Sequence, residues 1–215
     1  RHYHASAQKT KATSDYQEAV RWYRDIITGF PGEPDTARNH FLLGELLYED
    51  SRFAEASVEY EKTAYGYPQH DKSADAGYAA LLAYAEQDKR AAAADKPRLQ
   101  TTGVQSSLRF ADAFGKDPRV APVLTNAADR LYALKDVEQA QSVAERVLAL
   151  DPDIIVDAAW GERGREALRP EAPGWGKLRA IREGKVAHLD EESVLRPGPR
   201  VGEGLDALAR AVHGF

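Results

Sequence analysis

Four prolines that each close an apolar, helix-like stretch constrain this chain most strongly. Pro31, Pro68, Pro118 and Pro152 follow one another at intervals of 37, 50 and 34 residues. Proline ends a helix because it lacks the backbone N–H group and its ring clashes with the preceding turn. Helix stops that recur at such intervals are typical of helix pairs stacked into a solenoid. We therefore expect a mainly α-helical protein, with an α-solenoid over residues 15–152.

The clearest repeat covers residues 37–68, where small and bulky residues alternate as two packed helices require. Gly44 and Ala56 are small where two antiparallel helices come close, whereas Leu43 and Tyr60 fill the space between them. A Leu-Gly pair, a small Ala, an aromatic residue and a closing Pro resemble the tetratricopeptide repeat (TPR). This resemblance implies a TPR-type solenoid of antiparallel helix pairs. The alternative is a plain helical bundle in which the prolines recur by chance.

The other repeats are partial. Residues 15–31 look like a second helix alone, and residues 1–14 are expected to be a flexible N-terminus. Residues 73–118 read as a repeat with an insertion, 86–100, between its helices. Residues 121–152 form a weaker repeat, whose apolar stripe contains Leu131, Ala140 and Val147. We expect Trp22 and Trp160 to cap the ends, because a terminal helix pair otherwise exposes its apolar face.

By resemblance to TPR proteins, the first helix of each repeat lines a concave groove that binds a protein or peptide partner. Aromatic and charged side chains together suit a peptide or a partner helix, because the aromatics supply buried area and the charges fix the register. Packing of Phe41 and Tyr48 against neighbouring helices is the alternative for those two residues. The predicted groove residues are Arg38, Phe41, Glu45 and Tyr48 in the clearest repeat and Thr125, Asp129 and Tyr132 in the last.

After Pro152 the helical periodicity breaks. Residues 153–157 and 185–189 predict two short strands, with a helical stretch around 165–168 and a closing amphipathic helix over 204–213. Strands that alternate with helices indicate a small α/β segment, 153–215.

The tail over residues 145–215 has a further resemblance. The runs LALDPDIIVDAAW, APGWGKLRAIREGKVAHLD and LRPGPRVGEGLDALARAVH resemble the carboxyl end of periplasmic substrate-binding proteins of ABC importers. That family carries cobalamin, haem or iron-siderophores, which the resemblance implies as the transported ligand. It also implies a bacterial periplasm or cell-envelope location and makes Glu192 and Arg196 the candidate ligand contacts. The alternative for Arg196 is a solvated loop residue without a ligand.

The first lobe of that family is missing from this sequence, and two isolated strands leave unpaired edges. The tail therefore packs on the solenoid or pairs with another chain, as a homodimer or by strand pairing. A third alternative is that the chain is a chimera, because residues 144–152 satisfy both patterns.

The composition excludes several classes of function. The 215 residues carry a net charge of −5, which argues against nucleic acid as a partner. No apolar run is long enough for a transmembrane segment, and the absence of cysteine excludes disulfides and thiolate metal sites. The six histidines lack metal-site spacing, and no glycine-rich phosphate motif occurs. We thus predict a scaffold without catalysis, metal or cofactor, and keep the substrate-binding component of an importer as the alternative.

Overall fold

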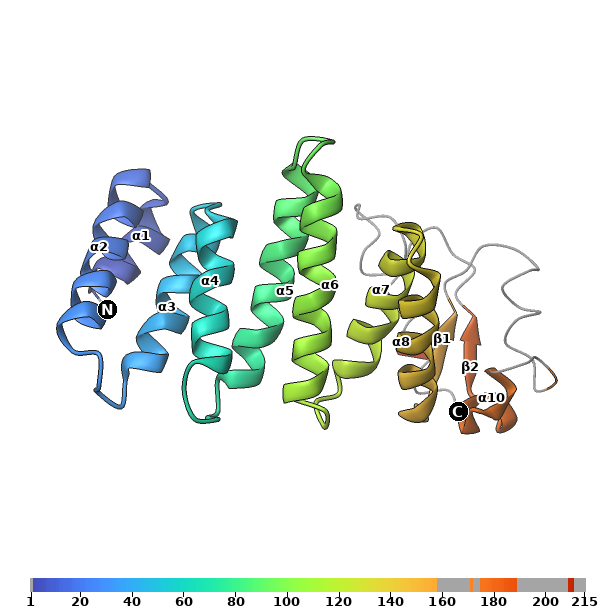
Figure 1. Ribbon diagram of the computed structural model, residues 1–215. Helices are drawn as coiled ribbons and strands as arrows, with labels where there is room; N and C mark the ends of the chain where they lie inside the picture. The colour runs from blue at the N-terminus through green and yellow to red at the C-terminus, as the bar shows by residue number, and fades with distance from the viewer. Residues whose placement is uncertain (1, 158–170, 172–174, 189–208, 211–215) are drawn as a thin grey trace. The chain divides into compact units, whose positions relative to one another are not determined.

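The computed structural model describes residues 2–157, 171, 175–188 and 209–210, and these residues are mainly helical, as predicted (Figure 1). The chain divides into two compact units, residues 1–140 and 141–215. The domain boundary that the sequence places after residue 152 stays a prediction. Among the described helices, none is long and apolar enough to cross a membrane.

The first unit is a succession of helices, each of which contacts the next one along the chain from α1 to α7. Figure 1 shows these helices in chain order, from α1 in blue to α7 in olive. The helix α8 begins in the first unit and ends in the second. The bounds are α1 (His2–Thr10), α2 (Thr13–Gly29), α3 (Thr36–Glu49), α4 (Phe53–Tyr65), α5 (Ser73–Arg90), α6 (Lys96–Ala113), α7 (Val120–Ala133) and α8 (Val137–Ala149).

The helix α1 lies where the sequence predicts a flexible N-terminus. It contacts α2 and buries Ala7 completely. In addition, the Nδ1 atom of His4 lies 3.2 Å from the Tyr23 hydroxyl. Tertiary packing against α2 stabilises a nine-residue segment that is too short to be helical by itself.

The pair α3 and α4 matches the clearest repeat. Leu43, Ala56 and Tyr60 are each no more than 2% exposed, which confirms them as core residues. At Gly44, a Cβ atom would lie only 2.7 Å from the Tyr60 ring, so the contact requires glycine. The connection between the two helices is short and polar, because α3 ends at Glu49 and α4 begins at Phe53.

The insertion predicted between the helices of the 73–118 repeat is mostly helical instead. Its first part completes α5, and its second part begins α6, so that residues 91–95 make the connection. Both helices have 18 residues, against 14 in α3 and 13 in α4. The inserted residues therefore add about one turn to each helix. Pro97 is compatible with this because it stands in the first turn of α6, where no intrahelical N–H bond is lost.

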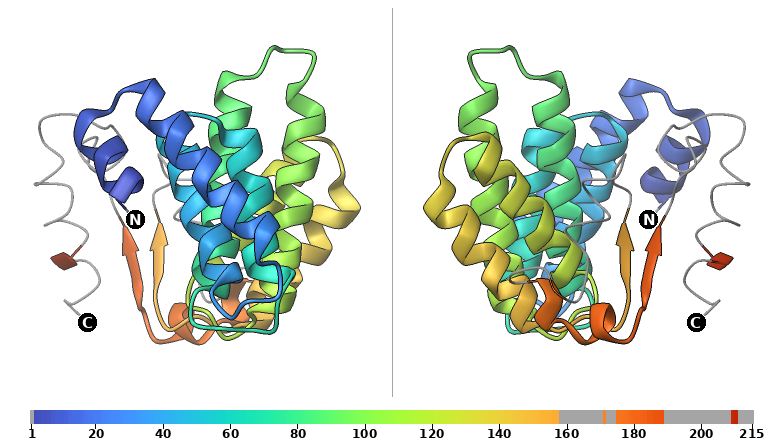
Figure 2. Two further views of the ribbon diagram at one scale, coloured as in Figure 1. Left: turned by 90° about the vertical axis from the view of Figure 1, so that its left-hand side faces the viewer. Right: turned by 90° about the vertical axis from the view of Figure 1, so that its right-hand side faces the viewer.

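The second unit contains two short parallel strands, β1 (Ile155–Asp157) and β2 (Val186–His188). They are paired in register from Ile155 with Val186 onward, and Figure 2 shows both arrows pointing the same way. The 3₁₀ turn η1 (Trp175–Lys177) and helix α10 (Arg179–Arg182) precede β2. Both predicted strands are confirmed, although each is shorter than expected. The helix predicted around 165–168 lies outside the described residues, as do 204–208 and 211–213 of the closing helix.

Candidate partner-binding groove

The predicted groove residues of α3 differ in their surroundings. Arg38 is exposed, whereas Phe41, Glu45 and Tyr48 are half-buried. The ring centroid of Phe41 lies 5.9 Å from that of Tyr60, and the Tyr60 hydroxyl donates a 2.6 Å hydrogen bond to Glu45 Oε1. The aromatic residues of α3 therefore pack within the first unit, as the alternative for them supposed. A partner-binding role for these four residues stays a prediction.

Arg38 borders a hollow of about 240 Å³ between α1, α2 and α3. Both apolar and polar side chains line it. Its other lining residues are His4, Ala5, Gln8, Tyr23 and Leu42. Burial lowers the pKa of His4, although the Glu49 carboxylate acts in the opposite direction. The imidazole of His4, which faces this hollow, is therefore uncharged at about pH 7.

The predicted groove residues of α7 lie on its exposed surface. Thr125 and Asp129 are exposed, and Tyr132 is 66% exposed. The hydroxyl of Thr125 donates to the carbonyl of Ala121 in the preceding turn, at 2.9 Å. These three residues do not line the cavity described next, and their role as groove residues stays a prediction.

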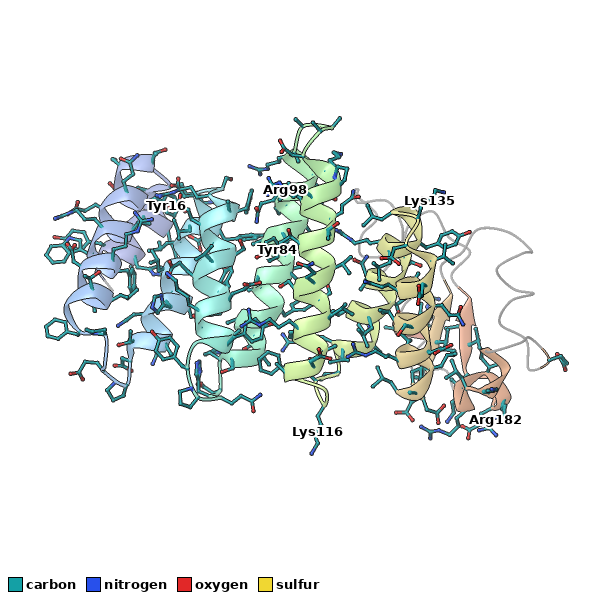
Figure 3. All side chains as sticks on the ribbon, viewed as in Figure 1. Tyr16, Tyr84, Arg98, Lys116, Lys135 and Arg182 are labelled. Atoms are coloured by element: carbon teal, nitrogen blue, oxygen red, sulfur yellow. The ribbon has the colours of Figure 1, made fainter. Side chains whose placement is uncertain are left out.

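A larger cavity, of about 320 Å³, lies between α5, α6 and α7. Its walls are mostly apolar, and a few polar groups stand among them. Leu82 is 45% exposed there, so apolar surface is open to an incoming side chain. Figure 3 marks Tyr84 about halfway along α5. The lining residues are Tyr78, Leu81, Leu82, Tyr84, Ala85, Gly103, Ser107, Pro122, Val123, Asn126 and Arg130.

The cavity has one cationic group, the guanidinium of Arg130. Its Nε donates a 2.9 Å hydrogen bond to Asn126 Oδ1, which holds the side chain along α7. Its Nη1 lies 3.9 Å from Asp88 Oδ2, a long and partly exposed ion pair. The other oxygen of Asp88, Oδ1, is buried without a hydrogen-bond partner within the described part of the chain. Arg130 is therefore a fixed cation that is only partly neutralised.

A polar network supports the α5 wall from the α4 side. The carboxylate of Glu61 on α4 accepts hydrogen bonds from the Tyr84 hydroxyl at 3.2 Å and from Ser106 Oγ at 2.9 Å. Burial and the Glu61 charge raise the pKa of Tyr84, so it remains a protonated donor. The network ties α4, α5 and α6 together and fixes one wall of the cavity.

The residues that line the cavity were not predicted from the sequence, although α5 and α7 each carry a helical spacing pattern that marks them. In α5, Tyr78, Leu81, Leu82 and Ala85 follow the i, i+3, i+4, i+7 pattern of one helix face. In α7, Pro122, Asn126 and Arg130 recur every four residues. The predicted residues Thr125 and Asp129 stand one position before Asn126 and Arg130, about 100° away around α7, so they lie on a neighbouring face of the helix.

A further charged pair is buried in the first unit. His40 and Glu59 form a buried pair between α3 and α4, with Nδ1 and Oε2 at 2.5 Å. Burial raises the pKa of Glu59, but hydrogen bonds from His40 and Lys62 outweigh it and hold this pKa below its usual value. No three His, Asp or Glu side chains gather as a metal site requires within the described residues. Glu192 and Arg196 lie outside the described residues.

Comparison with known proteins gives limited information. No protein-family model matches the chain. A curated relative from Bacillus subtilis (strain 168), named as the uncharacterized ABC transporter substrate-binding lipoprotein YvrC, is 27% identical over 99 residues. The match covers 46% of this chain and 31% of that protein, so the chain spans about a third of its relative's length. This weak similarity agrees with the resemblance to substrate-binding proteins and carries no information about the TPR.

Proposed function

We propose that residues 15–152 form a TPR-type α-solenoid of antiparallel helix pairs that binds a segment of another protein. In this proposal α3, α5 and α7 are the first helices of their pairs and line the groove. The molecule acts as a scaffold and performs no catalysis. The observation that carries the proposal is the open, mostly apolar cavity between α5 and α7, with a single fixed cation.

The cavity chemistry suits an extended segment or helix with one apolar anchor residue. Exposed Leu82 and the surrounding apolar wall offer area that an aliphatic or aromatic side chain can bury. Arg130 stands beside this wall, so an acidic group next to the anchor gains a charge-assisted hydrogen bond. Such anchors carry most of the binding energy in interfaces of this kind.

Peptide selection tests the proposal. Random peptides displayed on phage are selected on the immobilised full chain, and their dissociation constants are measured by fluorescence anisotropy. Leu82→Glu places a charge in the cavity and is expected to weaken binding at least about tenfold. Val58→Glu is the matched control, since Val58 is 49% exposed but lies on α4, outside the lining of the cavity.

Two outcomes contradict the proposal. One is the selection of no peptide whose binding saturates. The other is an equal loss of affinity in the Leu82→Glu and Val58→Glu variants, which means that charge anywhere on the surface weakens binding.

The second candidate is the substrate-binding component of an ABC importer for cobalamin, haem or an iron-siderophore. The similarity to the Bacillus lipoprotein supports it, at the level of a distant relative. Titration calorimetry of the full chain with cyanocobalamin and with haemin tests this function. Saturable binding at a stoichiometry of one favours transport, whereas heats of dilution alone argue against it.

The same similarity supports a place in the bacterial envelope, because the relative is named a lipoprotein. Fractionation of the native host, followed by immunodetection, tests this location. Recovery with periplasmic or envelope markers is expected, and recovery with cytoplasmic enzymes contradicts it.

A further inference from the structure

Another hollow of the first unit, of about 420 Å³, lies where the start of α4, the end of α5 and the start of α6 come together. The described residues that line it all differ from those that line the cavity between α5 and α7. Three arginines stand in its lining, namely Arg52, Arg90 and Arg98, and we call it the Arg90 hollow. Figure 3 labels Arg98 at the end of α6 that borders it.

The Arg90 hollow has one more cation than its carboxylates neutralise, although the chain as a whole has a net charge of −5. Among the described lining residues, the only carboxylates are Glu55 and Asp95. Arg52 donates to the two oxygens of Glu55 at 2.8 and 2.7 Å, and Arg98 Nη2 lies 3.6 Å from Asp95 Oδ1. Each carboxylate thus has its own guanidinium, and Arg90 forms no ion pair with any carboxylate of the described residues.

An aromatic ring holds Arg90 in place without satisfying its donors. The guanidinium carbon of Arg90 lies 4.4 Å from the centroid of the Phe53 ring, a favourable cation–π contact. Phe53 is only 7% exposed, and its ring packs edge-to-face on Tyr48 at 4.9 Å, so it offers a fixed surface. A ring does not accept the N–H groups of a guanidinium as a carboxylate does. The fork of donors on Arg90 is therefore available to an anion.

Apolar surface stands beside this cation. Leu99 on α6 is half-buried in the lining of the hollow, together with Ala54 and Ala91. A ligand that carries one negative charge and a short apolar chain uses both features, because the charge neutralises Arg90 and the chain covers the apolar side. The volume of the hollow lies in the usual range of small-molecule pockets.

We propose that the Arg90 hollow is a binding site for a small organic monocarboxylate. The carboxylate of the ligand accepts hydrogen bonds from the guanidinium of Arg90, and its apolar chain lies against Leu99. Arg52 and Arg98 occupy the carboxylates of the protein and so keep them from competing for Arg90. This site is separate from the cavity that we propose for a protein segment, so neither proposal depends on the other.

Nuclear magnetic resonance of the isotope-labelled full chain, titrated with sodium hexanoate, tests the site. Saturable shifts with a dissociation constant of about 1 mM or below are expected for a ligand of this size. Hexanamide has the same chain without the charge and is expected to give no saturable shift. Inorganic phosphate has charge without the chain and is expected to bind at least about tenfold more weakly than hexanoate.

A pair of arginine variants locates the bound ligand. Arg90→Gln removes the available cation and is expected to weaken hexanoate binding at least about tenfold. Arg182→Gln is the matched control, because it removes the same charge from an exposed position on α10, and it is expected to leave binding unchanged. Far-UV circular dichroism verifies that both variants keep their helix content.

Four results overturn the proposal. The absence of saturable shifts with hexanoate means that the hollow takes no monocarboxylate of this kind. Equal binding of hexanamide means that the apolar side alone holds the ligand. Phosphate that binds as tightly as hexanoate means that the chain contributes nothing. Equal affinity of wild type and Arg90→Gln means that hexanoate binds elsewhere on the molecule.

Discussion

At the residue scale, Gly44 sets the distance between α3 and α4. The Tyr60 ring lies where a Cβ atom of residue 44 would be, and the Tyr60 hydroxyl is fixed by Glu45. The ring therefore cannot move aside without breaking this partly buried hydrogen bond. This explains why a small residue is required one turn before Leu47 in the clearest repeat.

Gly44→Ala is expected to lower the free energy of unfolding by about 1–3 kcal/mol, the usual cost of overpacking a core. Urea denaturation followed by circular dichroism measures it. Gly29→Ala is the control, because Gly29 is also helical but has no atom within 4 Å of its added Cβ. The control is expected to raise stability by up to about 1 kcal/mol, since alanine reduces the freedom of the unfolded chain. Equal effects of the two substitutions would contradict the close contact.

The buried pair of His40 and Glu59 makes part of the stability depend on pH. The folded pKa of Glu59 is held below the ordinary glutamate value of 4.5, so the unfolded state binds this proton first as the pH falls. The contribution of Glu59 is therefore present above about pH 4.5 and is lost as the pH falls through the folded pKa.

Glu59→Gln is expected to cost about 2 kcal/mol at pH 7, the scale of hydrogen bonds to a buried charged group. The difference from wild type is expected to shrink toward zero as the pH falls through the folded pKa of Glu59, because the wild-type carboxyl is then also neutral. Urea denaturation at a series of pH values measures both. A difference that is the same at acid and neutral pH would show that Glu59 acts through packing alone.

At the scale of elements, the sequence predicted that the chain is mainly helical and which residues of the clearest repeat are buried. Leu43, Ala56 and Tyr60 were assigned to the core correctly because small and bulky residues alternate locally in that repeat. The groove residues predicted on α7 lie one position away from the cavity-lining residues of that helix, and the weaker repeat has no Leu-Gly pair that fixes which face of the helix is turned inward. The length of α5 and α6 was also missed, because their partners, rather than local composition, decide where a helix ends.

A matched pair of leucines tests the assignment of buried and open faces. Leu124 on α7 is 1% exposed, whereas Leu82 on α5 is 45% exposed. Leu124→Ala is expected to destabilise the protein by about 2–5 kcal/mol through a cavity, and Leu82→Ala by less than about 0.5 kcal/mol. Thermal unfolding of the two variants checks this. A large loss for Leu82→Ala would mean that this side chain belongs to the core and is not free to contact a partner.

At the scale of the whole molecule, the two units support different candidate functions. The first unit offers the cavity, which is built from helices that contact their neighbours in chain order. The second unit contributes a parallel strand pair. The ligand residues predicted for this unit, Glu192 and Arg196, fall outside the described residues. The sequence predicted the strands because short β-branched runs are local signals, whereas a binding site there depends on residues brought together by the fold.

Hydrogen–deuterium exchange of the full chain, with and without a selected peptide, tests the central claim most directly. The account predicts slower exchange in α5 and α7, at the residues that line the cavity, and unchanged exchange in β1 and β2. Protection confined to β1 and β2, or to α4, would contradict a binding groove between α5 and α7.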